Sequence, residues 1–172
     1  MHSTLSAGQA FPDITLPTLG GDETTLGQGE DWRMVVVYRG QHCPLCTRYL
    51  KQLTLLQPAF ADEGISVVAV SGDSQSQATG QMEEVSPNFP VAYGLTTKQM
   101  RTLGTYISDP RSEKETDHPF SEPALFVING EGNIQIADYS NAPFARPDLE
   151  ALLGGLKFVR ANAYPIRGTH TA

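Results

Sequence analysis

The sequence predicts an α/β domain with a mixed central sheet that has helices on both faces. Continuous apolar runs at residues 34–38, 65–70 and 124–128 are typical of strands buried on both sides. Helical patterns separate the first two runs, and a hairpin followed by a final helix closes the chain, an order typical of α/β folds. The 172 residues suit a single domain, for which we predict the bounds 1–172.

The domain is expected to begin with an N-terminal extension at residues 1–31, whose Gly, Pro, Thr and Asp content predicts turns and short strands. After the strand at 34–38, a helix is expected to begin near Cys43. Pro44 suits its first position, where the N–H that proline lacks would be unpaired anyway. We expect Pro58 to end or kink this helix, because proline cannot make the hydrogen bond of a helix interior.

The middle of the chain alternates between strands and helices. The strand at 65–70 is followed by a helix from about 74 to 85, a weak strand near 89–93 and a helix at 97–103. Residues 104–121 are polar and predict either an irregular loop or a short pair of strands.

The C-terminal part predicts a hairpin and a helix. Strands at 124–128 and 133–139 flank an Asn-Gly-Glu-Gly turn signal at 129–132. The last helix is expected at about 147–160, with acidic residues in its first turn and basic residues in its last, which suits the helix dipole. Residues 161–172 form a C-terminal tail without periodicity.

The composition argues against several classes of function. Lys and Arg number 12 against 19 Asp and Glu, a net charge of −7, so we expect no nucleic-acid partner and no membrane partner. No apolar run approaches the roughly 20 residues that cross a bilayer. The polar N-terminus, residues 1–10, has no signal-peptide pattern, so the expected location is cytoplasmic.

The chain has two cysteines, Cys43 and Cys46, placed where the first central strand gives way to a helix. At this junction Cys43 would cap the helix, where unpaired N–H groups and the helix dipole stabilise a thiolate. Cys46, one turn later, would lie within reach of a disulfide. We therefore expect Cys43 to be an exposed nucleophile and Cys46 to resolve its adducts, with His42 adding a positive charge or a hydrogen bond.

Two other interpretations of the pair are open. The cysteines could be buried structural residues that share a helix by chance. They could also bind a metal, but zinc needs about four ligands, and the four histidines of the chain show no partner spacing. We therefore predict no metal and no cofactor.

The segments at residues 8–17, 38–46 and 67–74 extend the pattern around the cysteines. With them, over residues 8–160, the chain resembles the peroxiredoxin-like branch of the thioredoxin superfamily, the alkyl hydroperoxide reductase/thiol-specific antioxidant family, in its members with a Cys-Pro-x-Cys motif. The resemblance implies a thioredoxin-like fold and an antioxidant oxidoreductase with a redox-active disulfide.

The chain also departs from the usual peroxiredoxin motif, Pro-x-x-x-Thr-x-x-Cys. If Cys46 is the cysteine of that motif, Arg39 replaces its proline and Cys43 its threonine. If Cys43 is that cysteine, Val36 and Gly40 stand at the two positions. Neither register is complete, which favours disulfide exchange over peroxide reduction.

The resemblance implies further site residues. Where peroxiredoxins place an arginine before a late strand, this chain has Pro123, which matches the cis-proline of thioredoxins. Pro123 is therefore expected to be cis and to shape a groove in which the backbone of Glu122 pairs with a substrate chain. Arg39 could orient a peroxide or lower a thiolate pKa, or form a structural ion pair. Pro123, Arg39 and His42 are the predicted substrate-binding residues.

These observations favour a thiol–disulfide oxidoreductase that acts on a thiol or disulfide protein and is recycled by a thiol reductant. One alternative is a thiol peroxidase that reduces hydrogen peroxide or alkyl hydroperoxides, with Cys46 attacked by peroxide and Cys43 closing the disulfide. The other is a non-enzymatic redox sensor that works as a homodimer, in which residues 164–167 of the tail dock on a second subunit.

Overall fold

The computed structural model describes residues 3–172; Met1 and His2, which belong to the predicted N-terminal extension, lie outside the described residues. The elements in chain order are β1 (Thr15–Pro17), β2 (Glu23–Thr25), β3 (Trp32–Val37), α1 (Pro44–Asp62), β4 (Ile65–Val70), α2 (Gln75–Val85), β5 (Val91–Ala92), α3 (Thr97–Leu103), β6 (Ile107–Ser108), β7 (Phe120–Ser121), β8 (Ala124–Ile128), β9 (Ile134–Tyr139) and α4 (Leu149–Asn162).

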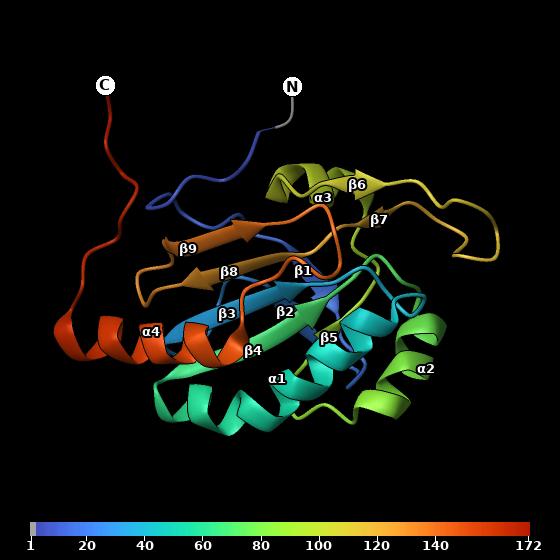
Figure 1. The fold of residues 1–172 in the computed structure, drawn as a ribbon, viewed down its shortest axis with the longest axis horizontal. Coiled ribbons are helices and arrows are strands. Elements are labelled where there is room, and N and C mark those ends of the chain that lie inside the picture. The colour runs from blue at the N-terminus through green and yellow to red at the C-terminus, as the bar shows by residue number, and fades with distance from the viewer. Residues whose placement is uncertain (1–2) are drawn as a thin grey trace.

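The central sheet has five strands in the order β5-β4-β3-β8-β9. β3 and β5 run parallel to β4, whereas β8 runs antiparallel to both β3 and β9, so the sheet is mixed. α1, α2 and α4 cover one face, and α3 covers the other face together with the N-terminal segment (Figure 1). This arrangement confirms the predicted α/β class with helices on both faces of a mixed sheet.

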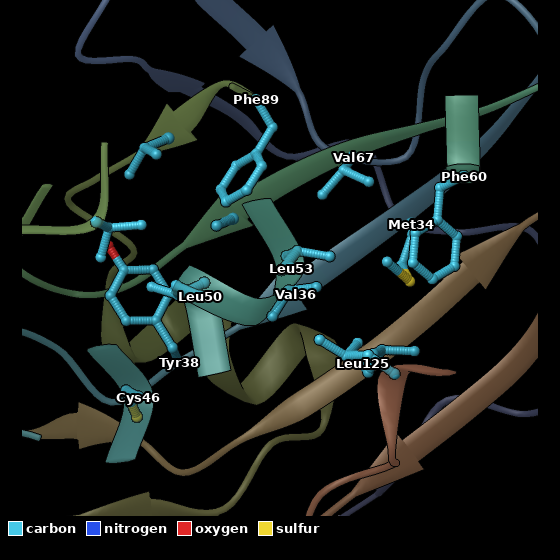
Figure 2. Packing of buried hydrophobic residues seen from close by; sticks show 14 of the residues in the cluster. Met34, Val36, Tyr38, Cys46, Leu50, Leu53, Phe60, Val67, Phe89 and Leu125 are labelled. Atoms are coloured by element: carbon cyan, nitrogen blue, oxygen red, sulfur yellow. The ribbon is translucent and has the colours of Figure 1, made fainter. Parts of the chain in front are cut away.

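The side chains of β3 alternate between the two hydrophobic cores. Met34 and Val36 pack in the cluster beneath α1, α2 and α4, whereas Val35 and Val37 belong to the cluster on the opposite face. Figure 2 shows Met34, Val36 and the fully buried Phe60 of α1 within the first cluster. Burial of each such side chain contributes roughly 1.5–3 kcal/mol, and the packing fixes α1 against the sheet.

Most predicted elements form close to the expected bounds. The strands at 65–70 and 124–128 and the helix at 97–103 have the predicted ends. Within residues 104–121, the short pair of strands forms rather than the irregular loop, because β6 and β7 pair antiparallel in a small sheet of their own.

Pro58 does not end α1, because the helix continues from Pro44 to Asp62. Pro58 lacks the N–H that would bond to the carbonyl of Thr54, one turn earlier in the helix. Asn88 supplies the missing donor, since its side-chain Nδ2 donates to the Thr54 carbonyl at 3.0 Å. The helix therefore runs on, and Phe60 reaches the core.

We predict that Asn88→Ala lowers the free energy of unfolding by about 0.5–1.5 kcal/mol, the usual contribution of one hydrogen bond, as measured by urea denaturation. The control repeats the change in a Pro58→Ala background, where the restored N–H can bond to the Thr54 carbonyl. There the loss should be close to zero. Equal losses in both backgrounds would contradict this explanation of the helix.

Candidate active site

The junction between β3 and α1 brings the two cysteines together. Cys43 is the N-cap of α1, and its backbone is extended with φ −113° and ψ 100°. Its Sγ accepts the backbone N–H of Cys46 at 3.3 Å, a cap bond that uses one of the unpaired N–H groups of the first turn. Cys43 and Cys46 are not joined by a disulfide in the structure.

Both cysteines are buried, which corrects the expectation of an exposed Cys43. The exposed fraction is 2% for Cys43 and 0% for Cys46. The start of α1 packs inward, so both residues join the hydrophobic cluster that contains Leu50 and Leu53. A protein substrate would have to displace the surrounding chain to reach either sulfur.

The two sulfurs differ in their tendency to ionise. The Cys46 thiol donates a hydrogen bond to the sulfur of Cys43, and this bond, the Cys46 N–H and the Arg39 side chain lower the pKa of Cys43 to about 6 despite burial. The pKa of Cys46 is raised instead, first because its thiol proton is held in the hydrogen bond to Cys43 and second because the residue is buried. At neutral pH Cys43 is therefore a thiolate and Cys46 a thiol.

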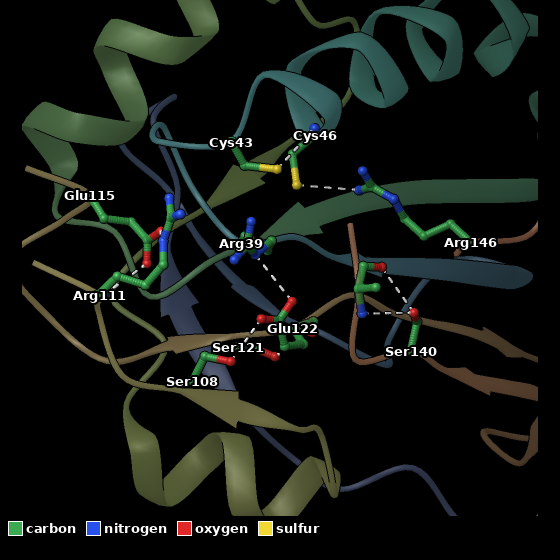
Figure 3. A network of polar contacts seen from close by, with 11 residues as sticks. Arg39, Cys43, Cys46, Ser108, Arg111, Glu115, Ser121, Glu122, Ser140 and Arg146 are labelled. Atoms are coloured by element: carbon green, nitrogen blue, oxygen red, sulfur yellow. Dashed lines mark hydrogen bonds and ion pairs between the residues drawn. The ribbon is translucent and has the colours of Figure 1, made fainter. Parts of the chain in front are cut away.

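Arg39 is the cation next to Cys43, and it is anchored from the opposite side of the site (Figure 3). Its Nε lies 3.1 Å from Oε2 of the buried Glu122, and its guanidinium lies over the Phe120 ring at 4.8 Å from the centroid. Ser108 Oγ donates to the other carboxylate oxygen of Glu122 at 2.7 Å. The ion pair therefore holds Arg39 beside the thiolate, so the two sequence-based interpretations of Arg39 are compatible.

The loop between β3 and α1 is fixed by Asp73, which follows β4. Asp73 is 1% exposed, and its Oδ2 accepts the backbone N–H of Gln41 at 2.7 Å. Its Oδ1 lies 3.1 Å from Nε2 of His118. Gly40 makes this approach feasible, because it has φ +138° and a Cβ there would lie 2.6 Å from Asp73 Oδ1. The loop that carries Arg39 is thus tied to the neighbouring strand.

The surroundings of His42 disfavour the positive charge that was one of its two expected contributions. Burial, followed by the charge of Arg39, lowers the pKa of His42 and so favours its neutral form. The ring packs against the ring of Phe120 at a tilt of 60°, with 4.4 Å between the centroids. Neither ring nitrogen has a hydrogen-bond partner among residues 3–172. The charge beside Cys43 comes from Arg39 instead.

Pro123 differs from the expectation in its peptide bond. No peptide bond within residues 3–172 is cis, so Pro123 is trans. It directly precedes β8, a position where proline's missing N–H does not interrupt the sheet. The backbone of Glu122 is also already engaged, since its N–H donates to Tyr106 O at 2.8 Å and its carbonyl accepts from Ser121 Oγ at 2.8 Å. The expected pairing of Glu122 with a substrate chain is therefore blocked in this conformation.

Arg146, which no sequence signal indicated, reaches the site from the loop between β9 and α4. Its Nη1 donates to Cys46 Sγ at 3.4 Å, across a separation of 100 residues in the chain. No spacing or periodicity links the two positions, so only the tertiary structure reveals the contact. The same arginine lines a surface groove of about 450 Å³, which also borders Leu45, Tyr49 and Phe144.

The described chain shows neither a cluster of metal-binding side chains nor a membrane-spanning helix. Within residues 3–172, no group of at least three His, Cys, Asp or Glu side chains is placed to hold a metal ion. None of the helices in this part of the chain combines the length and the apolar character needed to cross a membrane.

Comparison with known proteins gives a family match and two distant curated relatives. The model of the AhpC/TSA family matches residues 7–137. A probable 1-Cys peroxiredoxin of Syntrichia ruralis is 22% identical over 136 residues, which is 76% of this chain but only 62% of that protein. The thioredoxin-like protein YneN of Bacillus subtilis (strain 168) is 21% identical over 131 residues, covering 76% of this chain and 70% of YneN.

Solved structures agree on the fold. A cysteine-to-serine mutant of peroxiredoxin 6 from Arenicola marina has a TM-score of 0.80 at 19% identity and covers 93% of this chain and 76% of that one. Peroxidoxin BcpB from Mycobacterium tuberculosis has a TM-score of 0.73 at 18% identity and covers 90% of this chain and 98% of that one. These likenesses confirm the predicted thioredoxin-like fold.

We predict that Gly40→Ala lowers the free energy of unfolding by about 1–3 kcal/mol, because the new Cβ would meet the carboxylate of Asp73 at a φ that favours glycine. Gly94→Ala is the matched control, since Gly94 also has a positive φ but no atom within 4 Å of its Cβ position. Urea denaturation of both variants measures the difference. Equal losses would show that the contact with Asp73 does not constrain the loop.

Proposed function

The chain belongs to the AhpC/TSA family, and from this premise we propose that it is a thiol-dependent peroxidase that reduces hydrogen peroxide or alkyl hydroperoxides. Both enzymatic interpretations of the sequence, disulfide exchange and peroxide reduction, describe an oxidoreductase. Family membership, the name of the relative from Syntrichia ruralis and the name of the solved structure from Arenicola marina support the peroxidase better than the exchange enzyme that the sequence favoured.

The observation that carries this proposal is that Cys43 is both ionised and nearly sealed. Its pKa is lowered to about 6, first by the hydrogen bond from Cys46, while only 2% of the residue is exposed. Disulfide exchange with a folded protein requires an accessible sulfur, because the two sulfurs must meet in a mixed disulfide. A peroxide has a reacting group of two oxygen atoms, which needs far less room.

In the first step, the Cys43 thiolate attacks one oxygen of the peroxide. An S–O bond forms, the O–O bond breaks, and the departing alkoxide or hydroxide takes a proton from solvent. Cys43 becomes a sulfenic acid, two electrons more oxidised, and the peroxide becomes an alcohol or water. The Arg39 guanidinium lies beside the sulfur at which these charges change, and Glu122 holds it there.

In the second step, Cys46 loses its proton and attacks the Cys43 sulfur. The S–O bond breaks, a disulfide forms, and the hydroxide leaves as water once protonated. An external thiol reductant then returns the pair to two thiols by disulfide exchange. The predicted dithiol chemistry of the Cys-Pro-Leu-Cys sequence thus describes the return half of the cycle.

The roles of the cysteines in this proposal reverse those of the earlier peroxidase alternative. There, Cys46 reacted with peroxide because it occupies the position of the peroxiredoxin cysteine, although Arg39 and Cys43 replace the proline and the threonine of that motif. The order of the pKa values favours Cys43 as the attacking sulfur, because hydrogen bonding to Cys43 and burial keep Cys46 protonated. Direct contact of substrate with Arg39, His42 or Pro123 remains a prediction, as does a homodimer.

Stopped-flow oxidation of the reduced protein by hydrogen peroxide and by an alkyl hydroperoxide tests the proposal. We expect one disulfide for each peroxide consumed, at a rate far above that of free cysteine. Cys46→Ser should react once and stop at a sulfenic acid that dimedone traps, whereas Cys43→Ser should not react. A wild-type rate no higher than that of free cysteine would refute the peroxidase, and full reactivity of Cys43→Ser would assign the attack to Cys46.

The pH dependence of this oxidation provides a separate prediction. The thiolate is the reactive form, so the rate should fall as pH drops below the Cys43 pKa of about 6 and level off above it. Arg39→Gln should move the midpoint to higher pH, because it removes a hydrogen bond and a positive charge from the thiolate, and Arg39→Lys should restore part of the shift. An unchanged midpoint in Arg39→Gln would exclude Arg39 from activation of Cys43.

A further inference from the structure

Each sulfur of the pair has its own arginine. Arg39 lies beside Cys43, whereas Arg146 Nη1 donates to Cys46 Sγ at 3.4 Å. Figure 3 shows the two guanidinium groups approaching the sulfurs from different sides, with Arg146 coming from the loop after β9. The proposed attack on peroxide uses Arg39 and leaves Arg146 without a role.

Arg146 is held in place by α1 itself. Its guanidinium lies over the ring of Tyr49 at 4.4 Å from the centroid, a cation–π contact. The hydroxyl of Tyr49 donates to the carbonyl of Pro147 at 2.7 Å, so the residue after Arg146 is tied to the same helix. Because Cys46 lies one turn before Tyr49 on α1, the tyrosine holds the guanidinium next to the sulfur of Cys46.

The difficult requirement at Cys46 is the loss of its proton. Hydrogen bonding to Cys43 and burial raise the pKa of this thiol, whereas the positive charge of Arg146 acts in the opposite direction. A buried thiolate without a nearby cation would be strongly disfavoured, because the low-dielectric interior stabilises an unpaired charge poorly. A fixed guanidinium hydrogen-bonded to the sulfur provides that cation.

We propose that Arg146 is a catalytic residue of the resolution step, in which it stabilises the negative charge of Cys46 as this sulfur attacks the oxidised Cys43. This inference rests on the proposed function, which supplies peroxide as the natural oxidant of Cys43. The Cys46–proton bond breaks, the S–S bond forms, and the S–O bond of Cys43 breaks to release hydroxide. Cys46 is oxidised and Cys43 reduced. During recycling, Cys46 leaves as a thiolate when the reductant attacks Cys43, and Arg146 stabilises the same charge.

The expected size of the effect follows from two opposing terms. A hydrogen bond to a charged group changes the population of that charged form about tenfold or more. Part of this gain is offset, because a less basic thiolate is also a weaker nucleophile. We therefore expect Arg146→Gln to slow disulfide closure about three- to tenfold at neutral pH.

Closure can be measured without peroxide. Methyl methanethiosulfonate is small, and it converts the Cys43 thiolate to a methyl disulfide with release of methanesulfinate. Cys46 then attacks the Cys43 sulfur and expels methanethiolate. Rapid quenching followed by intact-protein mass spectrometry separates the two rates. Arg48→Gln is the matched control, because Arg48 is an exposed arginine of α1.

Arg146→Gln should leave the first rate unchanged, slow the second, and shift the pH profile of the second to higher pH, while Arg146→Lys restores part of the rate. Arg48→Gln should change neither rate. An unchanged second rate in Arg146→Gln, or equal slowing by Arg48→Gln, would overturn the inference. An Arg146→Gln variant that slows only the formation of the methyl disulfide would overturn it as well.

A peroxide arm separates this inference from the proposed function. If the protein is a peroxidase, Arg146→Gln should accumulate Cys43 sulfenic and sulfinic acid under turnover, because closure lags behind oxidation. If wild-type protein fails to react with peroxide but the methyl disulfide assay gives the expected result, the peroxidase proposal is wrong and the role of Arg146 stands. Normal closure in Arg146→Gln with efficient peroxide turnover refutes only the role of Arg146.

Discussion

The site depends on one negative charge that two buried sulfurs must share at the start of α1. Ionising both would place like charges side by side in a low-dielectric interior, and ionising neither would leave no nucleophile. The cap geometry decides between the sulfurs, because Cys43 accepts both the N–H and the thiol proton of Cys46. One proton held between the two sulfurs thus defines an attacking and a resolving cysteine.

The surrounding structure supports this asymmetry with groups from distant parts of the chain. Arg39 comes from the loop after β3 and is anchored by Glu122, which precedes β8. Asp73, after β4, fixes the loop between β3 and α1 through the backbone of Gln41. Arg146 reaches the second sulfur from the loop before α4. The mixed sheet brings these segments to one end of α1. The charges around the two sulfurs therefore depend on the fold as a whole.

The sequence was informative wherever the signal is local. Apolar runs and turn residues predict the central strands, because burial on both faces requires such runs, and the cap chemistry of the Cys-Pro-Leu-Cys sequence predicts the cysteine pair. Prediction failed where a distant partner decides the outcome. Pro58 does not end its helix because Asn88 donates to the freed carbonyl, and the contact between Arg146 and Cys46 leaves no trace in residue spacing. Pro123 is trans and Cys43 buried because the fold around them, rather than their own sequence, sets these features.

The central claim is that Cys43 carries the charge and Cys46 the proton, and residue-resolved ionisation tests it most directly. NMR of protein with isotope-labelled cysteine Cβ atoms follows each sulfur separately, and Cys43→Ser and Cys46→Ser assign the signals. The account predicts a Cys43 transition near pH 6, with Cys46 unionised through neutral pH. A transition of Cys46 before Cys43, or of Cys43 near the ordinary cysteine value of about 8.5, would contradict it.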